Sequence, residues 1–151
     1  MREKKIEYGI KVGPRVDMTK LHPEMVERMW KLDEALKDRK QWVLCYSGYR
    51  DPREQDVMFL QGRGDPMEIM RLRIELKLPD LTLAEMRRVV TYEKGSESPH
   101  CFGMAIDCVP MASRGPYLGK LLWHPDQPKQ DRNHWARFGK AVEDVGLKWG
   151  G

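Results

Sequence analysis

The sequence has few cysteines and no long apolar run. No stretch reaches the about 20 apolar residues that a membrane-spanning helix needs, so we expect no membrane partner. The three cysteines, Cys45, Cys101 and Cys108, cannot all pair within one chain and form no CxxC motif. We therefore expect reduced thiols rather than a disulfide framework. The basic N-terminal segment is followed by no apolar segment, so we expect no secretory signal peptide.

Internal repeats, low-complexity tracts and long linkers are also missing from the 151 residues. Hydrophobic residues make up 40% and charged residues 33% of the chain, which is typical of a folded globular protein and not of a disordered one. We therefore expect a single domain covering residues 1–151, and we expect it to be a monomer.

The charge is positive but evenly mixed. The net charge is +4 and the sequence pI is about 9.0, which favours an anionic partner such as nucleic acid, anionic lipid or a cell-wall polymer. The basic runs contain acidic residues too, and no basic stripe is interleaved with aromatic residues as in single-strand binders. We therefore expect no nucleic-acid partner.

Hydrophobic periodicity predicts an α+β protein. An apolar stripe of Met25, Met29, Leu32 and Leu36 predicts a helix over residues 21–40. The residues before it read as irregular or extended. The further elements predicted are strands at 41–47 and 102–110, and helices at 52–61, 67–78, 82–90 and 131–146.

The segment "SPHCFGMAID", residues 98–107, places a histidine and an aspartate seven positions apart. In a strand, Asp107 would face away from the core, while Met104, Ile106 and Cys108 would face into it. His100 would lie in the loop before the strand. Imidazole and carboxylate are a common pair of zinc ligands. The alternative is a surface histidine and a turn-facing aspartate that bind no metal, and the spacing alone leaves both open.

Three motifs extend this pattern along nearly the whole chain. The segment 98–107 fits S-x-H-x-x-G-x-A-x-D, "SGYR" precedes the helix predicted at 52–61, and "GLKWGG" closes the sequence. With them the chain resembles the phage endolysin peptidases that cut between L-alanine and D-glutamate. More broadly it resembles the VanY-like D-Ala-D-Ala carboxypeptidase superfamily, whose fold is shared with Hedgehog signalling domains.

The resemblance implies a fold and a reaction. The fold would be Hedgehog/DD-peptidase-like, with a small antiparallel sheet flanked by helices. The reaction would be zinc-dependent hydrolysis of an amide bond in the stem peptide of bacterial peptidoglycan, namely L-Ala–D-Glu. A bacteriolytic phage endolysin of this kind would stay in the host cytoplasm until it is released to the cell wall. The alternatives are a D,D- or L,D-carboxypeptidase and an inactive relative that only binds wall peptide.

The resemblance also implies roles for particular residues. His100 and Asp107 would be ligands of a Zn²⁺ cofactor. Arg50 would face the cleft as a catalytic residue that holds a substrate carboxylate or the oxyanion formed during attack. Ser98 would hydrogen-bond substrate, and Gln55 is a weaker candidate for the same role. Read without the resemblance, Arg50 would be a surface residue paired with a neighbouring acid.

The third zinc ligand and the general base of the family lie a little beyond "GLKWGG", where this chain stops at Gly151. We therefore expect the peptidase-like domain to be incomplete at its C-terminus. The other two explanations are an inactive relative and a substitute histidine. The candidates for that substitute are His124 and His134, which we otherwise expect to be solvated or capping residues, whereas His22 beside Pro23 is expected to be structural.

Overall fold

The structure, a computed structural model, describes residues 6–113, 118–123 and 132–149. Contacts within the chain divide it into two compact units. The first, called the sheet unit here, consists of Met1–Gly48 and Ile106–Gly151, and the second, the helical unit, is Tyr49–Ala105. The helical unit is thus an insertion between two parts of the sheet unit. The expectation of one domain over residues 1–151 stays a prediction.

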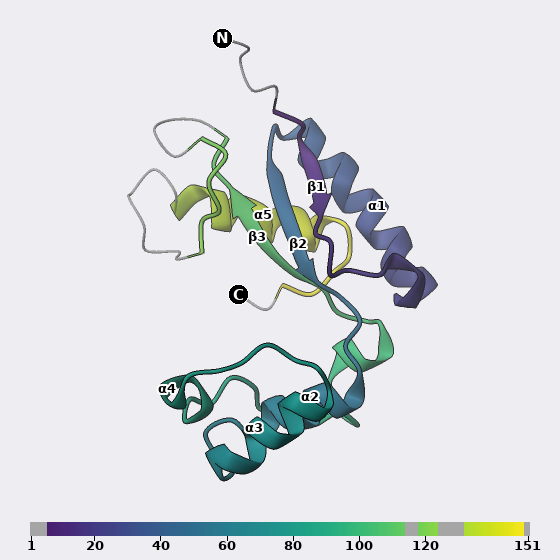
Figure 1. The fold of residues 1–151 in the computed structure, drawn as a ribbon. Coiled ribbons are helices and arrows are strands. Elements are labelled where there is room, and N and C mark those ends of the chain that lie inside the picture. Colours follow the sequence, from purple (N-terminus) through teal and green to yellow (C-terminus); the bar gives the residue numbers. More distant parts are fainter. Residues whose placement is uncertain (1–5, 114–117, 124–131, 150–151) are drawn as a thin grey trace. The chain divides into compact units, whose positions relative to one another are not determined.

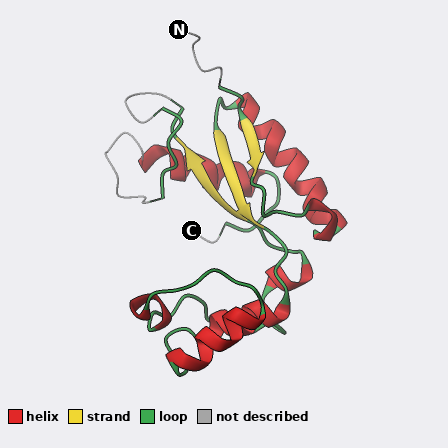
Figure 2. Cartoon of the chain, in the orientation of Figure 1, coloured by secondary structure: helices red, strands yellow, loops and turns green. Residues whose placement is uncertain are grey.

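Among its described residues the sheet unit has three strands and two long helices (Figures 1 and 2). The strands are β1 (Gly9–Val12), β2 (Trp42–Ser47) and β3 (Asp107–Met111), in the order β1-β2-β3. The helices are α1 (Pro23–Asp38) and α5 (Arg132–Asp144), and a 3-10 turn, η1 (Met18–Lys20), precedes α1. This arrangement confirms the predicted α+β class.

The pairing of the sheet corrects one expectation. β2 and β3 are antiparallel, as predicted, but β1 and β2 are parallel. The reason is α1, whose 16 residues carry the chain back along the sheet before β2 begins, so that both strands run the same way. The sheet is therefore mixed rather than antiparallel. β1 itself was predicted only as irregular or extended chain, because four residues are too few to show a clear alternation.

The helix predicted at 21–40 forms as α1, over Pro23–Asp38. His22 is the N-cap, and its Nδ1 accepts a hydrogen bond of 3.1 Å from the Glu24 N–H. Pro23 occupies the first turn, where its missing N–H costs no hydrogen bond. The predicted apolar stripe is buried in full. The structural role expected for His22 is thereby confirmed.

The core of the sheet unit lies on one face of the sheet, between the strands and the two helices. Leu32 and Leu36 of α1 pack with Val43 of β2 and with Phe138 and Val142 of α5. In Figure 1, α5 passes behind β2 and β3, and α1 runs beside β1. Because the two helices share one buried cluster with Val43, they cover the same face of the sheet. Tyr46 and Trp123 form an exposed aromatic pair with ring centroids 5.1 Å apart.

The helical unit is built from short helices that begin in similar ways. They are α2 (Pro52–Leu60), α3 (Pro66–Glu75), α4 (Leu83–Met86) and the 3-10 helix η2 (Pro99–Phe102). Asp51 and Asp65 cap α2 and α3, each followed by a proline, and Thr82 caps α4 in a capping box with Glu85. No helix in the described ranges is long and apolar enough to cross a membrane.

Two predicted elements are shorter than expected. The helix predicted at 82–90 ends at Met86, whose carbonyl accepts a hydrogen bond from the Gly62 N–H instead of continuing the helix. The strand predicted at 102–110 begins only at Asp107, because the preceding residues form η2, which ends at Gly103 with a φ of 69°. Met104, expected in the core, is consequently 42% exposed.

The core predicts a specific loss of stability. Leu36 is completely buried, so Leu36→Ala removes apolar contacts and leaves a cavity. We expect the free energy of unfolding to fall by about 2–5 kcal/mol, measured by urea denaturation followed by circular dichroism. The same substitution at Leu83, which is 48% exposed, should cost less than about 1 kcal/mol. Equal losses at both positions would contradict the described core.

Candidate active site

Arg50 lies in the loop between β2 and α2 and is held at its backbone and at its side chain. Its N–H donates to the carbonyl oxygen of His100 at 3.1 Å. Its guanidinium donates from Nη1 to Oε1 of Gln55 at 2.7 Å. Asp51, the next residue in the sequence, caps α2 and pairs with Arg53 at 2.9 Å. The structure thus brings Arg50, Gln55 and the backbone of His100 together within the helical unit.

Gln55 is the best-buried polar residue of this group, with 1% of its surface exposed. Its Nε2 donates to Thr91 Oγ1 at 3.1 Å and to the Glu93 carbonyl oxygen at 2.8 Å, while its Oε1 accepts from Arg50. A side chain with all of these partners is fully engaged inside the protein. This burial favours a supporting role for Gln55, whereas the sequence suggested substrate contact or plain solvation.

The segment that leads to the histidine motif is fixed onto the first turns of α2. Asp56 accepts a hydrogen bond of 2.7 Å from the Gly95 N–H. A Cβ at Gly95 would collide with the backbone of Pro52, so only glycine allows this close approach. Asp56 and Gly95 were not singled out from the sequence, and neither were Thr91 and Glu93. The local signal for Thr91, Glu93 and Gly95 is the turn-rich composition of "TYEKGSES", which does not identify the helix that the segment packs on.

Ser98 and His100 lie at the start of η2 in the same unit. Ser98 is 2% exposed, and its side chain makes no capping hydrogen bond to η2. His100 is half-buried, and its carbonyl oxygen accepts from both Arg50 and Gly103. The histidine therefore sits in a short helical turn instead of the open loop expected before a strand. The rigid proline before it and the left-handed Gly103 after it define that turn.

Asp107 belongs to the sheet unit, where it is the first residue of β3. It pairs with Ser47 of β2 just past an irregularity in the register at Tyr46. Its neighbour Cys108 packs against the core, so strand alternation places Asp107 on the opposite face. This agrees with the predicted direction of its side chain. The two proposed zinc ligands thus come from different units, His100 from the helical unit and Asp107 from the sheet unit.

Two thiols lie directly beside Asp107 in the sheet. Cys45 of β2 is opposite Cys108 of β3, and their side chains hydrogen-bond each other. The hydrogen bond from Cys108 lowers the pKa of the Cys45 thiol. The same contact, together with burial, raises the pKa of Cys108 well above its usual value. Both cysteines are free thiols, as the sequence predicted.

The other histidines differ from one another. His134 of α5 is 3% exposed, and its Nε2 lies 3.3 Å from Ser113 Oγ, so it is a buried residue and not the solvated one that we expected. His124 lies outside the described residues. Within the described ranges, no group of three or more His, Cys, Asp or Glu side chains could hold a metal ion. The donor types of His100 and Asp107 suit zinc, but no third donor completes such a group there.

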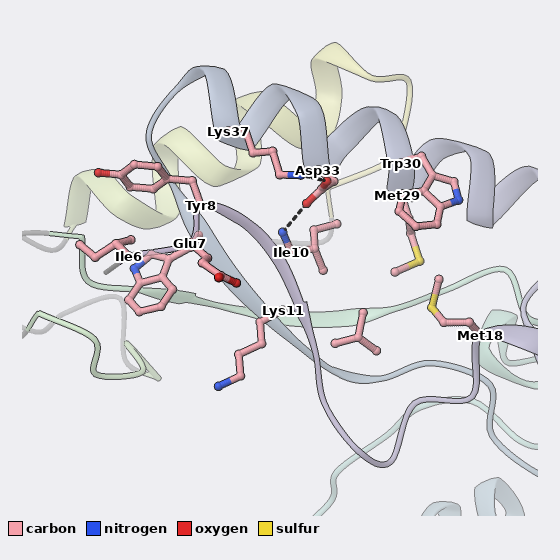
Figure 3. A pocket seen from close by; sticks show the side chains of 12 residues that line it. Ile6, Glu7, Tyr8, Ile10, Lys11, Met18, Met29, Trp30, Asp33 and Lys37 are labelled. Atoms are coloured by element: carbon pink, nitrogen blue, oxygen red, sulfur yellow. Dashed lines mark hydrogen bonds and ion pairs between the residues drawn. The ribbon is translucent and has the colours of Figure 1, made fainter. Parts of the chain in front are cut away.

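A pocket of about 790 Å³ lies elsewhere in the sheet unit, beside β1 and α1 (Figure 3). Asp33 lies between Lys37, with which it forms an ion pair of 2.8 Å, and the Ile10 N–H, from which it accepts a hydrogen bond of 2.8 Å. The Asp33 carboxylate therefore satisfies part of the otherwise unpaired edge of β1. None of the motif residues lines this pocket.

Two comparisons with known proteins bear on the motif. Residues 91–151 match the Peptidase M15 family described as D-alanyl-D-alanine carboxypeptidase, and this segment contains Ser98, His100 and Asp107. Both matches support the resemblance of the chain to the VanY-like D-Ala-D-Ala carboxypeptidase superfamily.

The second match is to a particular curated protein. The chain is similar to the peptidoglycan L-alanyl-D-glutamate endopeptidase CwlK of Bacillus subtilis (strain 168), with 24% identity over 131 residues. The alignment takes in 87% of this chain and 65% of that relative, so the chain spans somewhat less than two thirds of the relative's length.

The hydrogen bonds of Gln55 predict a loss of stability without a change of side-chain size. Gln55→Met keeps the length of the side chain but removes its bonds to Arg50, Thr91 and the Glu93 carbonyl. We expect the free energy of unfolding to fall by about 1–3 kcal/mol, measured by urea denaturation, because buried polar partners lose their hydrogen bonds. The control is Arg53→Met on the same helix, where an exposed ion pair should contribute less than about 1 kcal/mol. A Gln55→Met protein as stable as this control would contradict the described network.

Proposed function

We propose that this chain is a zinc-dependent peptidase of bacterial peptidoglycan that hydrolyses an amide bond of the stem peptide, the L-Ala–D-Glu bond. The observation that carries the proposal is the S-x-H-x-x-G-x-A-x-D element, which lies inside the segment matching the peptidase family. The similarity to an L-alanyl-D-glutamate endopeptidase supports the choice of bond. In this proposal residues 1–151 belong to a single peptidase-like domain.

His100 and Asp107 are the proposed zinc ligands. Zinc supplies Lewis-acid polarisation of the scissile carbonyl and a bound water of lowered pKa. The protein contributes two donors whose backbones are fixed, one in the turn of η2 and one at the start of β3. The His100 carbonyl is tied to the Arg50 N–H, which restrains the backbone that carries the imidazole.

Arg50 is the proposed anion-binding residue. Its guanidinium can bind a stem-peptide carboxylate, or the oxyanion formed during attack, through two parallel N–H donors. The hydrogen bond to Gln55 occupies one nitrogen and fixes the plane of the group. Gln55 is therefore proposed as a positioning residue for Arg50, and Ser98 as a residue that hydrogen-bonds substrate.

The proposed biological setting is phage-type lysis. The family resemblance supports a bacteriolytic endolysin that stays in the host cytoplasm until it reaches the wall, and the net charge of +4 suits an anionic wall polymer. In this setting the chain acts as a monomer and needs neither nucleic acid nor a membrane as partner.

Carboxypeptidase activity is the second candidate, because the matching family is described as D-alanyl-D-alanine carboxypeptidase. The products distinguish the two activities. Digestion of purified peptidoglycan by an endopeptidase exposes new amino groups on D-glutamate, whereas a carboxypeptidase releases free D-alanine. Release of D-alanine alone would mean that the protein cleaves the bond to the terminal D-alanine and not the L-Ala–D-Glu bond. Release of neither product would favour a relative that only binds wall peptide.

Zinc binding is the first test of the proposed ligands. After mild chelation and addition of zinc, His100→Ala and Asp107→Asn should each bind zinc at least about 100-fold more weakly than the parent protein, measured by metal titration. His22→Ala is the matched control, because His22 only caps α1 and should leave zinc affinity unchanged. Zinc affinity that is equal in all three variants and the parent would exclude His100 and Asp107 as ligands.

The role of Arg50 is tested by a change that keeps its charge. Arg50→Lys retains the cation but loses the planar pair of donors, so we expect kcat/KM on a stem peptide to fall about 100-fold. Arg53 is a nearby residue with an exposed side chain, so Arg53→Lys should keep the activity of the parent. If Arg50→Lys is as active as Arg53→Lys, the guanidinium does not bind the reacting groups.

A further inference from the structure

Cys45 and Cys108 occupy a special position in the sheet. They are direct partners in the antiparallel pair of β2 and β3. The Cys45 carbonyl accepts a hydrogen bond of 2.8 Å from Gly13, which follows β1, so the backbone polar groups of Cys45 face away from β3. Cys45 and Cys108 are therefore a non-hydrogen-bonded pair, the kind in which opposite Cα atoms lie about 4.5 Å apart. Disulfides span Cα separations of about 4.4–6.8 Å.

The side chains of the pair point the same way and touch. Both pack against the core clusters of the sheet unit, and their thiols hydrogen-bond each other. Cys45 is fully buried, and Cys108 is partly buried. Cys101, the remaining cysteine, belongs to η2 in the helical unit. The geometry thus selects one pair among the three thiols.

We propose that Cys45 and Cys108 are an oxidation site that forms an intrachain disulfide when the protein meets a peroxide. In the first step the sulfur of one of the two thiols attacks hydrogen peroxide and becomes a sulfenic acid, and one water is released. In the second step the sulfur of the other cysteine attacks that sulfur, the S–S bond forms and a second water leaves. The two thiols together lose two electrons and two protons, and the peroxide is reduced to two waters.

The position of the disulfide in the chain determines how it changes the stability of the protein. The whole helical unit, Tyr49–Ala105, lies between the two cysteines, so the disulfide closes a loop that contains it. Closing a long loop restricts the unfolded chain, and this raises the stability of the folded state. The oxidised protein should therefore unfold at a higher temperature than the reduced protein. The disulfide can form whether or not the protein is a peptidase, so its test is independent of the proposed function.

The test counts thiols and maps the bond. The fully reduced 151-residue protein is treated with hydrogen peroxide, unfolded in the presence of an alkylating reagent and weighed by mass spectrometry, and its peptides are then mapped. We expect a single alkylated cysteine, Cys101, and a linked peptide pair that contains Cys45 and Cys108. The thermal unfolding midpoint should rise by several degrees and return to its first value after reduction.

Two variants sharpen the result. Cys101→Ala should still form the bond, whereas Cys108→Ala should leave two alkylatable thiols after the same treatment. The number of alkylated thiols in the parent protein tests the proposed disulfide even if a variant folds poorly. Three alkylated thiols, a link that includes Cys101, or sulfinic acid in place of the bond would each overturn the proposal.

Discussion

The pairing of β2 with strands on both of its sides is the constraint on which the sheet unit depends. β2 is the central strand, and it joins β1 from the N-terminal part of the chain to β3 from the C-terminal part. Val43 and Cys45 direct its buried face into the two core clusters beneath the helices. Truncating the buried side chains of β2 would therefore disturb its pairing with β1 and β3 and the two core clusters that contain Val43 and Cys45. The same strand leads directly into the loop of Arg50 and pairs with Asp107 through Ser47.

In the helical unit a single buried amide, the side chain of Gln55, holds separate segments of the chain together. Gln55 connects the arginine after β2 to the segment before the histidine motif, so two stretches far apart in sequence are held by one side chain. Buried hydrogen bonds of this kind are costly to leave incomplete, which fixes the partners in one arrangement. A guanidinium ordered before substrate arrives loses less conformational entropy on binding than a free one. Stability and the proposed recognition therefore depend on the same contacts.

Local sequence patterns predicted most helices and strands, but they could not predict contacts between residues far apart in the sequence. The stripe through Met25 and Leu32 repeats over a few residues, so hydrophobic periodicity identified α1. The partners of Gln55 lie 36 and 38 residues away, and no local pattern distinguishes such a glutamine from a solvated one. The burial of His134 against Ser113 depends likewise on tertiary packing. Motif spacing named His100 and Asp107, but spacing alone could not assign them to two units.

The insertion of the helical unit between β2 and β3 has a consequence for how the chain can vary in length. The entropy of closing a flexible loop grows only with the logarithm of its length, so each doubling costs about 0.6 kcal/mol. Extra residues in the segment that links α3 to α4 would therefore add little to the cost of pairing β3 with β2. A deletion or insertion in β2 would instead shift the register of both of its neighbours. Among related chains, differences in length should accordingly collect between Tyr49 and Ala105, while the spacing within the strands stays fixed.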